Sequence, residues 1–208
     1  LALTANDADS EGAGENALER IRRHLRTKGA DALVEMIMDL AERDLTLFRT
    51  LDMAAASASN DDETMFARFR KAIHDATRTG GFIPYREVAG WAHEVKAVLD
   101  SVAKLVTDGR AAMALRLIDY ALSRIKDAMG EIDDSAGHGG GLLERARDIH
   151  LAACRAVRPD PVALAGELYT REMNEIFDTF YGSAARYADI LGEAGLAEFR
   201  RLAAAAWK

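Results

Sequence analysis

Residues that could bind a ligand gather in one glycine-rich segment, residues 131–141. Within it, Asp133 and Asp134 supply carboxylates, and Ser135 and His138 supply further polar atoms. The segment leads into an expected helix, whose first backbone N–H groups could hold an anion, whereas the two carboxylates could hold a cation. The alternating acidic ligands of a calcium loop are absent. Two hypotheses follow: a connector whose Asp and Ser side chains cap local backbone, or a site for a small molecule or metal ion.

A histidine and the only cysteine lie four residues apart, at His150 and Cys154. On a helix both side chains could face one metal ion, but a closed zinc site needs two more ligands. Their stripe also includes Leu143 and Val157, which favours a buried histidine beside a structural cysteine. The spacing of Arg145 and His150 matches helical ribonucleases of the HEPN type, but similar Arg–His pairs occur twice more in the chain. This pattern therefore discriminates poorly.

Three acidic residues, Glu172, Glu175 and Asp178, follow one another at intervals of three. On one helical face they could form a metal-binding stripe. Since no histidines stand at matching positions of another helix, the di-iron bundle hypothesis is weak and a solvated face is favoured.

Aromatic residues gather near the C-terminus, at Phe177, Phe180, Tyr181 and Tyr187. The simplest interpretation is that they pack between the last helices. If they are partly exposed, they form a surface on which a peptide can dock. We accordingly expect Phe177, Phe180 and Tyr181 to be candidates for binding a protein partner.

Helices must position these residues, because the chain has only three prolines and no segment that alternates like a strand. The clearest apolar periodicity predicts helices over residues 84–105, 110–129, 142–157 and 161–176. Short connections make neighbouring helices antiparallel. The predicted fold is all-α, an irregular tetratricopeptide-like stack of antiparallel helical hairpins with about ten helices. The hairpins begin at uneven intervals, unlike the steady tetratricopeptide period of roughly 34 residues.

The organisation along the chain is predicted to be simple. Residues 1–14 are expected to be a flexible acidic lead-in or linker, because their composition buries little apolar surface. Residues 15–208 are expected to form a single helical-repeat domain, with a subdivision near residues 80–84 as an alternative. The sequence starts at Leu1 instead of Met, which indicates a fragment or a trimmed start.

The composition, 49% hydrophobic and 29% charged over 208 residues, is that of an ordinary globular protein. The 27 Lys and Arg residues are outnumbered by 34 Asp and Glu, so the net charge of -7 argues against nucleic acid as a partner. No apolar run approaches the roughly 18 residues of a membrane helix, so no membrane association is expected. A single cysteine and the lack of a secretory leader pattern predict a cytoplasmic protein.

Several short stretches resemble a known family, and they comprise residues 117–122, 132–135, 151–155, 159–161, 178–182 and 187–196. Together they resemble a bacterial all-helical domain of unknown function, found in proteobacterial proteins, some of which also carry a SWIM-type zinc finger. The resemblance extends over about residues 15–207 and implies helical repeats in a cytoplasmic bacterial protein. This chain lacks the Cys-x-Cys and Cys-x-His pairs of a SWIM finger, so a zinc or DNA role is not carried over.

No coherent catalytic set emerges, and no cofactor is expected. The leading hypothesis is a non-enzymatic scaffold that binds another protein, or an upstream domain of its own chain, through a groove between hairpins. The alternative is a small-molecule or metal-binding activity centred on residues 131–141, with Asp133, Asp134 and His138 as ligands or acid–base groups.

Overall fold

The computed structural model describes residues 10–58 and 61–206, and the expected all-α fold is confirmed over them. Ten helices are formed there: α1 (Ser10–Arg26), α2 (Ala30–Ala41), α3 (Leu45–Ser57), α4 (Asp62–Thr77), α5 (Tyr85–Thr107), α6 (Ala111–Met129), α7 (His138–Val157), α8 (Pro161–Asn174), α9 (Ser183–Arg186) and α10 (Ala188–Ala206). None of these helices is both long and apolar enough to cross a membrane.

Three helix starts are set by side-chain caps. Asp44 accepts hydrogen bonds from the first backbone amides of α3, and Asp61 does the same for α4. Asp160 accepts from the amide of Ala163, and Pro161 occupies the first position of α8, where its missing N–H costs nothing. The starts of α3, α4 and α8 are thus set by residues adjacent to them in the sequence.

The start of α7 differs from the sequence expectation. The glycine run was expected to precede the helix, but α7 begins at His138 and includes Gly139 and Gly141. Near the C-terminus, the short α9 is followed by the longer α10. The backbone of α10 is non-helical at Gly192 (φ 54°, ψ -161°), where the helix is kinked.

The structure divides into two compact units, one ending at Phe48 and the other beginning at Arg49. In the first unit, α2 buries only Ala41 and leaves most of its large apolar side chains exposed. The expected lead-in falls largely on residues 1–9, which lie outside the described residues. The expectation of one domain over residues 15–208 stays a prediction.

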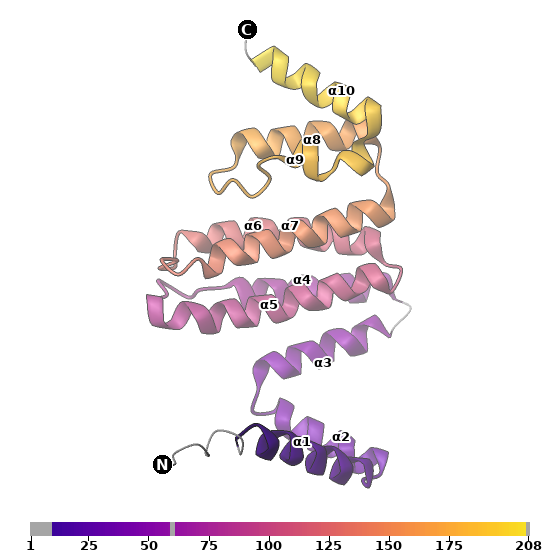
Figure 1. Cartoon of the computed structure of the whole chain (residues 1–208), viewed down its shortest axis with the longest axis vertical. Helices are drawn as coiled ribbons and strands as arrows, with labels where there is room; N and C mark the ends of the chain where they lie inside the picture. The colour runs from indigo at the N-terminus through magenta and orange to yellow at the C-terminus, as the bar shows by residue number, and fades with distance from the viewer. Residues whose placement is uncertain (1–9, 59–60, 207–208) are drawn as a thin grey trace, which may run out of the picture. The chain divides into compact units, whose positions relative to one another are not determined.

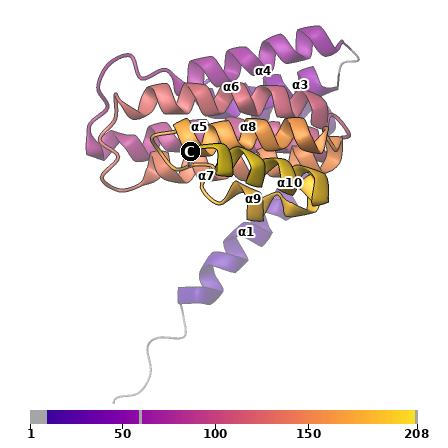
Figure 2. The ribbon, with the colours of Figure 1, turned by 90° about the horizontal axis from the view of Figure 1, so that it is seen from above.

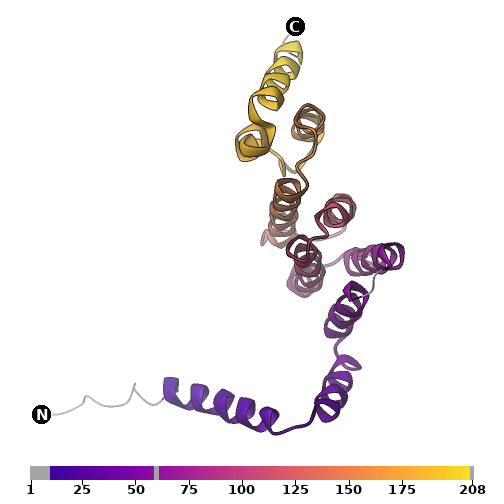
Figure 3. The same ribbon diagram turned by 90° about the vertical axis from the view of Figure 1, so that its right-hand side faces the viewer.

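The second unit is built from successive helical hairpins (Figure 1). Helix α4 pairs with α5, α6 pairs with α7, and α8 packs against α9 and α10. Seen from the side in Figure 3, these helices appear nearly end-on, and Figure 2 shows the same helices from above. Helix α6 contacts α4, α5 and α7 and buries its alanine stripe, as its two apolar stripes predict.

Three turns lie at the same end of this unit, on the left of Figure 1: residues 78–84, 130–137 and 175–182. We call this the turn end. A short parallel bridge links the first two turns, because the amide of Ile83 donates to the carbonyl of Glu131 at 2.7 Å and the amide of Asp133 donates to the carbonyl of Ile83 at 3.0 Å. Both segments from which the sequence predicts function, residues 131–141 and the aromatic segment around Phe177–Tyr181, lie at the turn end.

Candidate functional site

The carboxylate of Asp134 caps helix α7. Its Oδ1 accepts the amide of Gly139 at 2.7 Å, and its Oδ2 accepts the amide of Gly140 at 3.0 Å. Gly139 is buried, and a Cβ there would collide with the sulfur of Met129. The first amides of α7, which could have held an external anion, are thus already bonded to a side chain of the same segment.

Asp133 is engaged in a similar local way. Its Oδ1 accepts hydrogen bonds from the amide of Ser135, at 3.3 Å, and from the Ser135 hydroxyl. Across the described residues, no group of three or more His, Cys, Asp or Glu side chains is placed to hold a metal ion. The geometry of Asp133, Asp134 and Ser135 therefore matches the connector hypothesis, and a ligand role for these three residues stays a prediction.

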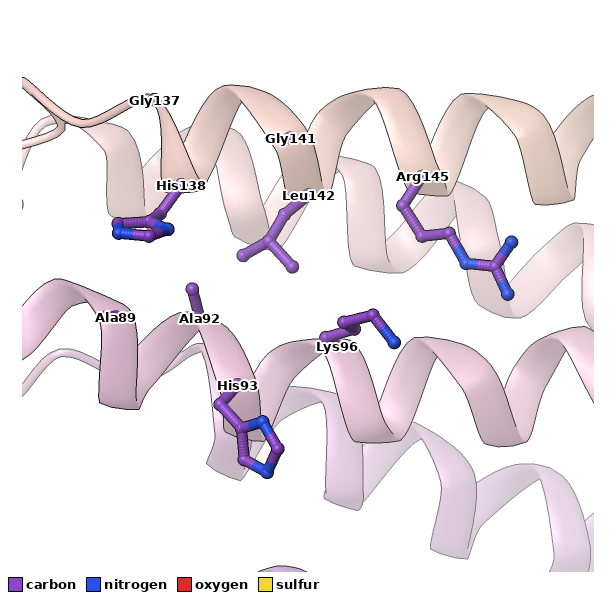
Figure 4. A pocket seen from close by; sticks show the side chains of 9 residues that line it. All are labelled: Ala89, Ala92, His93, Lys96, Gly137, His138, Gly141, Leu142 and Arg145. Carbon is purple, nitrogen blue, oxygen red and sulfur yellow. The ribbon is translucent and has the colours of Figure 1, made fainter. Parts of the chain in front are cut away.

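His138 is exposed and borders an open cleft between α5 and α7, with a volume of about 430 Å³ (Figure 4). Two cationic side chains, Lys96 from α5 and Arg145 from α7, lie together toward the other end of the cleft. His93 also borders it, but its ring turns away from His138 (Figure 4). The two histidines therefore do not form a pair that could share a metal ion.

One carboxylate ties the two cations together. Asp100 accepts from the ammonium of Lys96 at 2.7 Å and from the guanidinium of Arg145 at 2.8 and 3.2 Å. Partial burial raises the pKa of Asp100, but the hydrogen bonds from Lys96 and Arg145 outweigh it and hold this pKa below 3.8. Asp100 is consequently ionised at neutral pH and balances only one of the two positive charges.

The aromatic residues of the turn end separate into inner and outer side chains. Phe180 is fully buried, so it belongs to the core, which corrects its expected place on a partner-binding surface. Phe177 and Tyr181 are 40% and 72% exposed, and Ile176 beside them is 90% exposed. Together with Met173 on the last turn of α8, these exposed side chains form what we call the apolar edge, which comprises Met173, Ile176, Phe177 and Tyr181.

Polar contacts hold the apolar edge in place. Glu172 accepts from the amide of Ser183 at 3.1 Å and from its hydroxyl at 2.7 Å. Glu175 forms an ion pair with Lys126 in the last turn of α6. Two of the three acidic residues expected on a solvated face thus make partly buried contacts instead, because α8 packs with that face toward its neighbours.

His150 lies in a buried polar cluster that joins the α6–α7 hairpin to the C-terminal helices. Its Nδ1 is 2.9 Å from the hydroxyl of Tyr187 and 3.6 Å from the sulfur of Cys154. Its Nε2 lies 3.6 Å from the carboxylate of Asp119, which also accepts from Arg171 at 2.7 Å. The expectation of a buried histidine beside a structural cysteine is confirmed, whereas the sequence indicated none of the other three partners.

Burial decides the protonation of this cluster. Desolvation lowers the pKa of His150 to about 4, although the nearby Asp119 carboxylate acts in the opposite direction. Burial likewise raises the pKa of the Cys154 thiol to about 12 and raises that of Tyr187. At neutral pH the imidazole and the thiol are both uncharged, so this pair is not an activated nucleophile and base.

Similarity to known proteins identifies the family alone. Residues 17–208 match a family of unknown function (DUF6880), and the chain belongs to this family. No curated protein and no solved structure matches the chain significantly. The expected resemblance to a domain of unknown function is confirmed, and any activity has to be argued from the geometry described above.

Proposed function

We propose that this chain is a cytoplasmic, tetratricopeptide-like protein that binds a protein partner, or an upstream domain of its own chain, at the apolar edge. The observation that carries the proposal is the exposure of Ile176 and Tyr181 on a segment whose neighbour Phe180 is fully buried. Large apolar side chains that gather on a surface typically mark a site of protein association.

The anchoring of the segment supports this role. Phe180 inserts into the core, Glu172 holds Ser183, and Glu175 holds Lys126, so the exposed side chains start from a fixed backbone. A partner that binds a preorganised surface loses less conformational entropy than one that must first order a flexible loop. Covering these side chains with a partner would remove apolar surface from water, and little conformational entropy would be lost because the backbone is already held in place.

Charge and compartment are consistent with the proposal. The net charge of -7 disfavours nucleic acid as the partner, and the single cysteine suits a reducing compartment. The α4–α5 and α6–α7 hairpins pack on each other, and side-chain contacts join α6 and α7 to the C-terminal helices, so the turns are left available for binding.

A comparative capture experiment tests the proposal. The full chain is immobilised as wild type, as Ile176→Asp, and as a control Val162→Asp, which adds the same charge at an exposed position of the same region. We expect a protein from a lysate of the source cells to be retained by the wild type and by the control and to be lost from Ile176→Asp.

The reverse pattern contradicts the proposal. If every retained protein binds all three forms equally, the apolar edge is not the docking surface. Circular dichroism of each form verifies that the loss of a partner does not come from unfolding.

A further inference from the structure

From the cleft between α5 and α7 we infer a binding site for a small organic oxyanion, a carboxylate or a phosphate monoester carried on an apolar body. Nine residues line the cleft: Ala89, Ala92, His93, Lys96, Gly137, His138, Gly141, Leu142 and Arg145. It is separate from the apolar edge, and it uses none of the carboxylates of residues 131–141.

Small side chains create the cleft. Ala89 and Ala92 lie one turn apart on α5, and Gly137 and Gly141 lie at the start of α7 opposite them. A Cβ placed on Gly141 would meet nothing within 4 Å, so the space there is open. The volume of about 430 Å³ is in the range of small-molecule sites, and the alanines provide an apolar wall.

The side-chain charges select an anion. None of the nine lining residues is acidic, whereas Lys96 and Arg145 are both cationic and are 60% and 44% exposed. Asp100 binds both cations but compensates only one charge. Arg145 uses Nε and one terminal nitrogen for this contact, and its other terminal nitrogen, Nη1, makes no hydrogen bond to a described residue.

A second cleft of similar size provides a contrast. It is lined by residues 75–94 of α4, α5 and their connection, and its lining includes Asp75, Glu87 and Glu94 as well as two arginines. An anion entering there would meet carboxylates directly. Of the two clefts, only the α5–α7 cleft therefore has a lining that favours an anion.

His138 places a further donor at the mouth of the α5–α7 cleft (Figure 4). The inference does not use the N-terminal amides of α7, because Asp134 already occupies two of them. In the arrangement we infer, the apolar body lies on Ala89 and Leu142, and the oxyanion faces Lys96 and Arg145.

Titration with simple probes tests this site. Sodium benzoate and phenyl phosphate are added to the full ¹⁵N-labelled chain, and the amide signals are followed by NMR at constant ionic strength. We expect saturable shifts at Gly137, Gly141 and Leu142 with one or both probes, and weaker binding of benzyl alcohol and of inorganic phosphate. Benzyl alcohol lacks the charge, and inorganic phosphate lacks the apolar body.

Matched variants assign the binding to side chains. Lys96→Gln is expected to lower the affinity for the probe by about tenfold, because it removes a charged hydrogen-bonding group. Its control is Lys104→Gln, at an exposed position near the end of the same helix, which is expected to leave the affinity unchanged. Ala89→Glu places a competing carboxylate at an exposed lining position and is expected to abolish binding. Ala112→Glu is its control on the exposed face of α6.

Three results would overturn the inference. One is the absence of shifts with both probes at millimolar concentration, and another is equal binding of benzyl alcohol and benzoate. The third is unchanged affinity in folded Lys96→Gln and Ala89→Glu. Since Ile176→Asp does not touch this cleft, its effect on partner capture is independent of all these outcomes.

Discussion

Helix α7 carries two histidines, one at its first residue and one beyond its middle, and the two have opposite surroundings. His138 is exposed at the turn end, beside a cleft with two cations, whereas His150 is buried against Tyr187 and Cys154 at the seam with the C-terminal helices. The difference shows that a polar residue type does not by itself indicate function. The buried histidine fixes helices together, and the exposed one leaves its donors available to a ligand.

The largest difference in the free energy of unfolding between a core and a surface substitution is expected at two adjacent aromatic residues, Phe180 and Tyr181. Phe180→Ala should lower the free energy of unfolding by about 3–5 kcal/mol, because it removes a fully buried ring and leaves a cavity. Tyr181→Ala, at an exposed position of the same turn, should change it by less than about 0.5 kcal/mol. Urea denaturation of the two variants measures both values, and similar losses would mean that the division into inner and outer side chains is wrong.

The buried histidine should make the stability of the folded chain depend on pH. An unfolded histidine titrates near 6.5 and His150 in the folded chain at about 4, so the unfolded state binds the proton first as the pH falls. Stability that is complete above pH 6.5 is therefore lost between pH 6.5 and about 4, by about 3 kcal/mol at roughly 1.4 kcal/mol per pKa unit.

Denaturation curves across this pH range measure the effect. His150→Gln should have a shallower fall in the free energy of unfolding than the wild type. An equal slope in both proteins would show that His150 is not buried in its neutral form.

The smallest expected loss of stability comes from removing carboxylates at the turn end. Asp134→Ala removes the cap of α7 and should cost about 1 kcal/mol, whereas Asp133→Ala, which leaves that cap intact, should cost less. Thermal unfolding of the two variants separates them. If Asp133→Ala is the more damaging change, the local cap does not control this segment.

The sequence predicts the helices of the second unit because local rules set them. The caps at Asp61 and Asp160 and the apolar periodicity of α5 and α6 need no knowledge of the fold. The predicted start of the helix that became α7 was wrong, because the low helix propensity of Gly139, Gly140 and Gly141 indicates a loop. The cap by Asp134 and the close approach of Met129 to Gly139 favour the helix there, and the second depends on how α6 packs against α7.

The candidate sites were only partly predictable. The sequence indicates that Phe177, Phe180 and Tyr181 belong together, but it does not indicate which ring is buried, because irregular segments have no period from which a face can be assigned. For the α5–α7 cleft, the sequence indicates His138 on one side but neither the α5 side nor Arg145. The only further signal is the pairing of small residues on two helices that are distant in sequence, such as Ala89 and Gly141, and their proximity depends on hairpin packing.

The bridge between Ile83 and Ile132 has a practical consequence for engineering. It fixes the lengths of two turns that are distant in the sequence, so an inserted tag in either turn would break backbone hydrogen bonds that cross between hairpins. The turn at Asp108 and Gly109, which joins α5 to α6, is exposed, and the amides of these two residues donate to carbonyls of α5. A fluorescent or affinity insertion is therefore best tolerated there, at the end of the hairpins opposite the turn end.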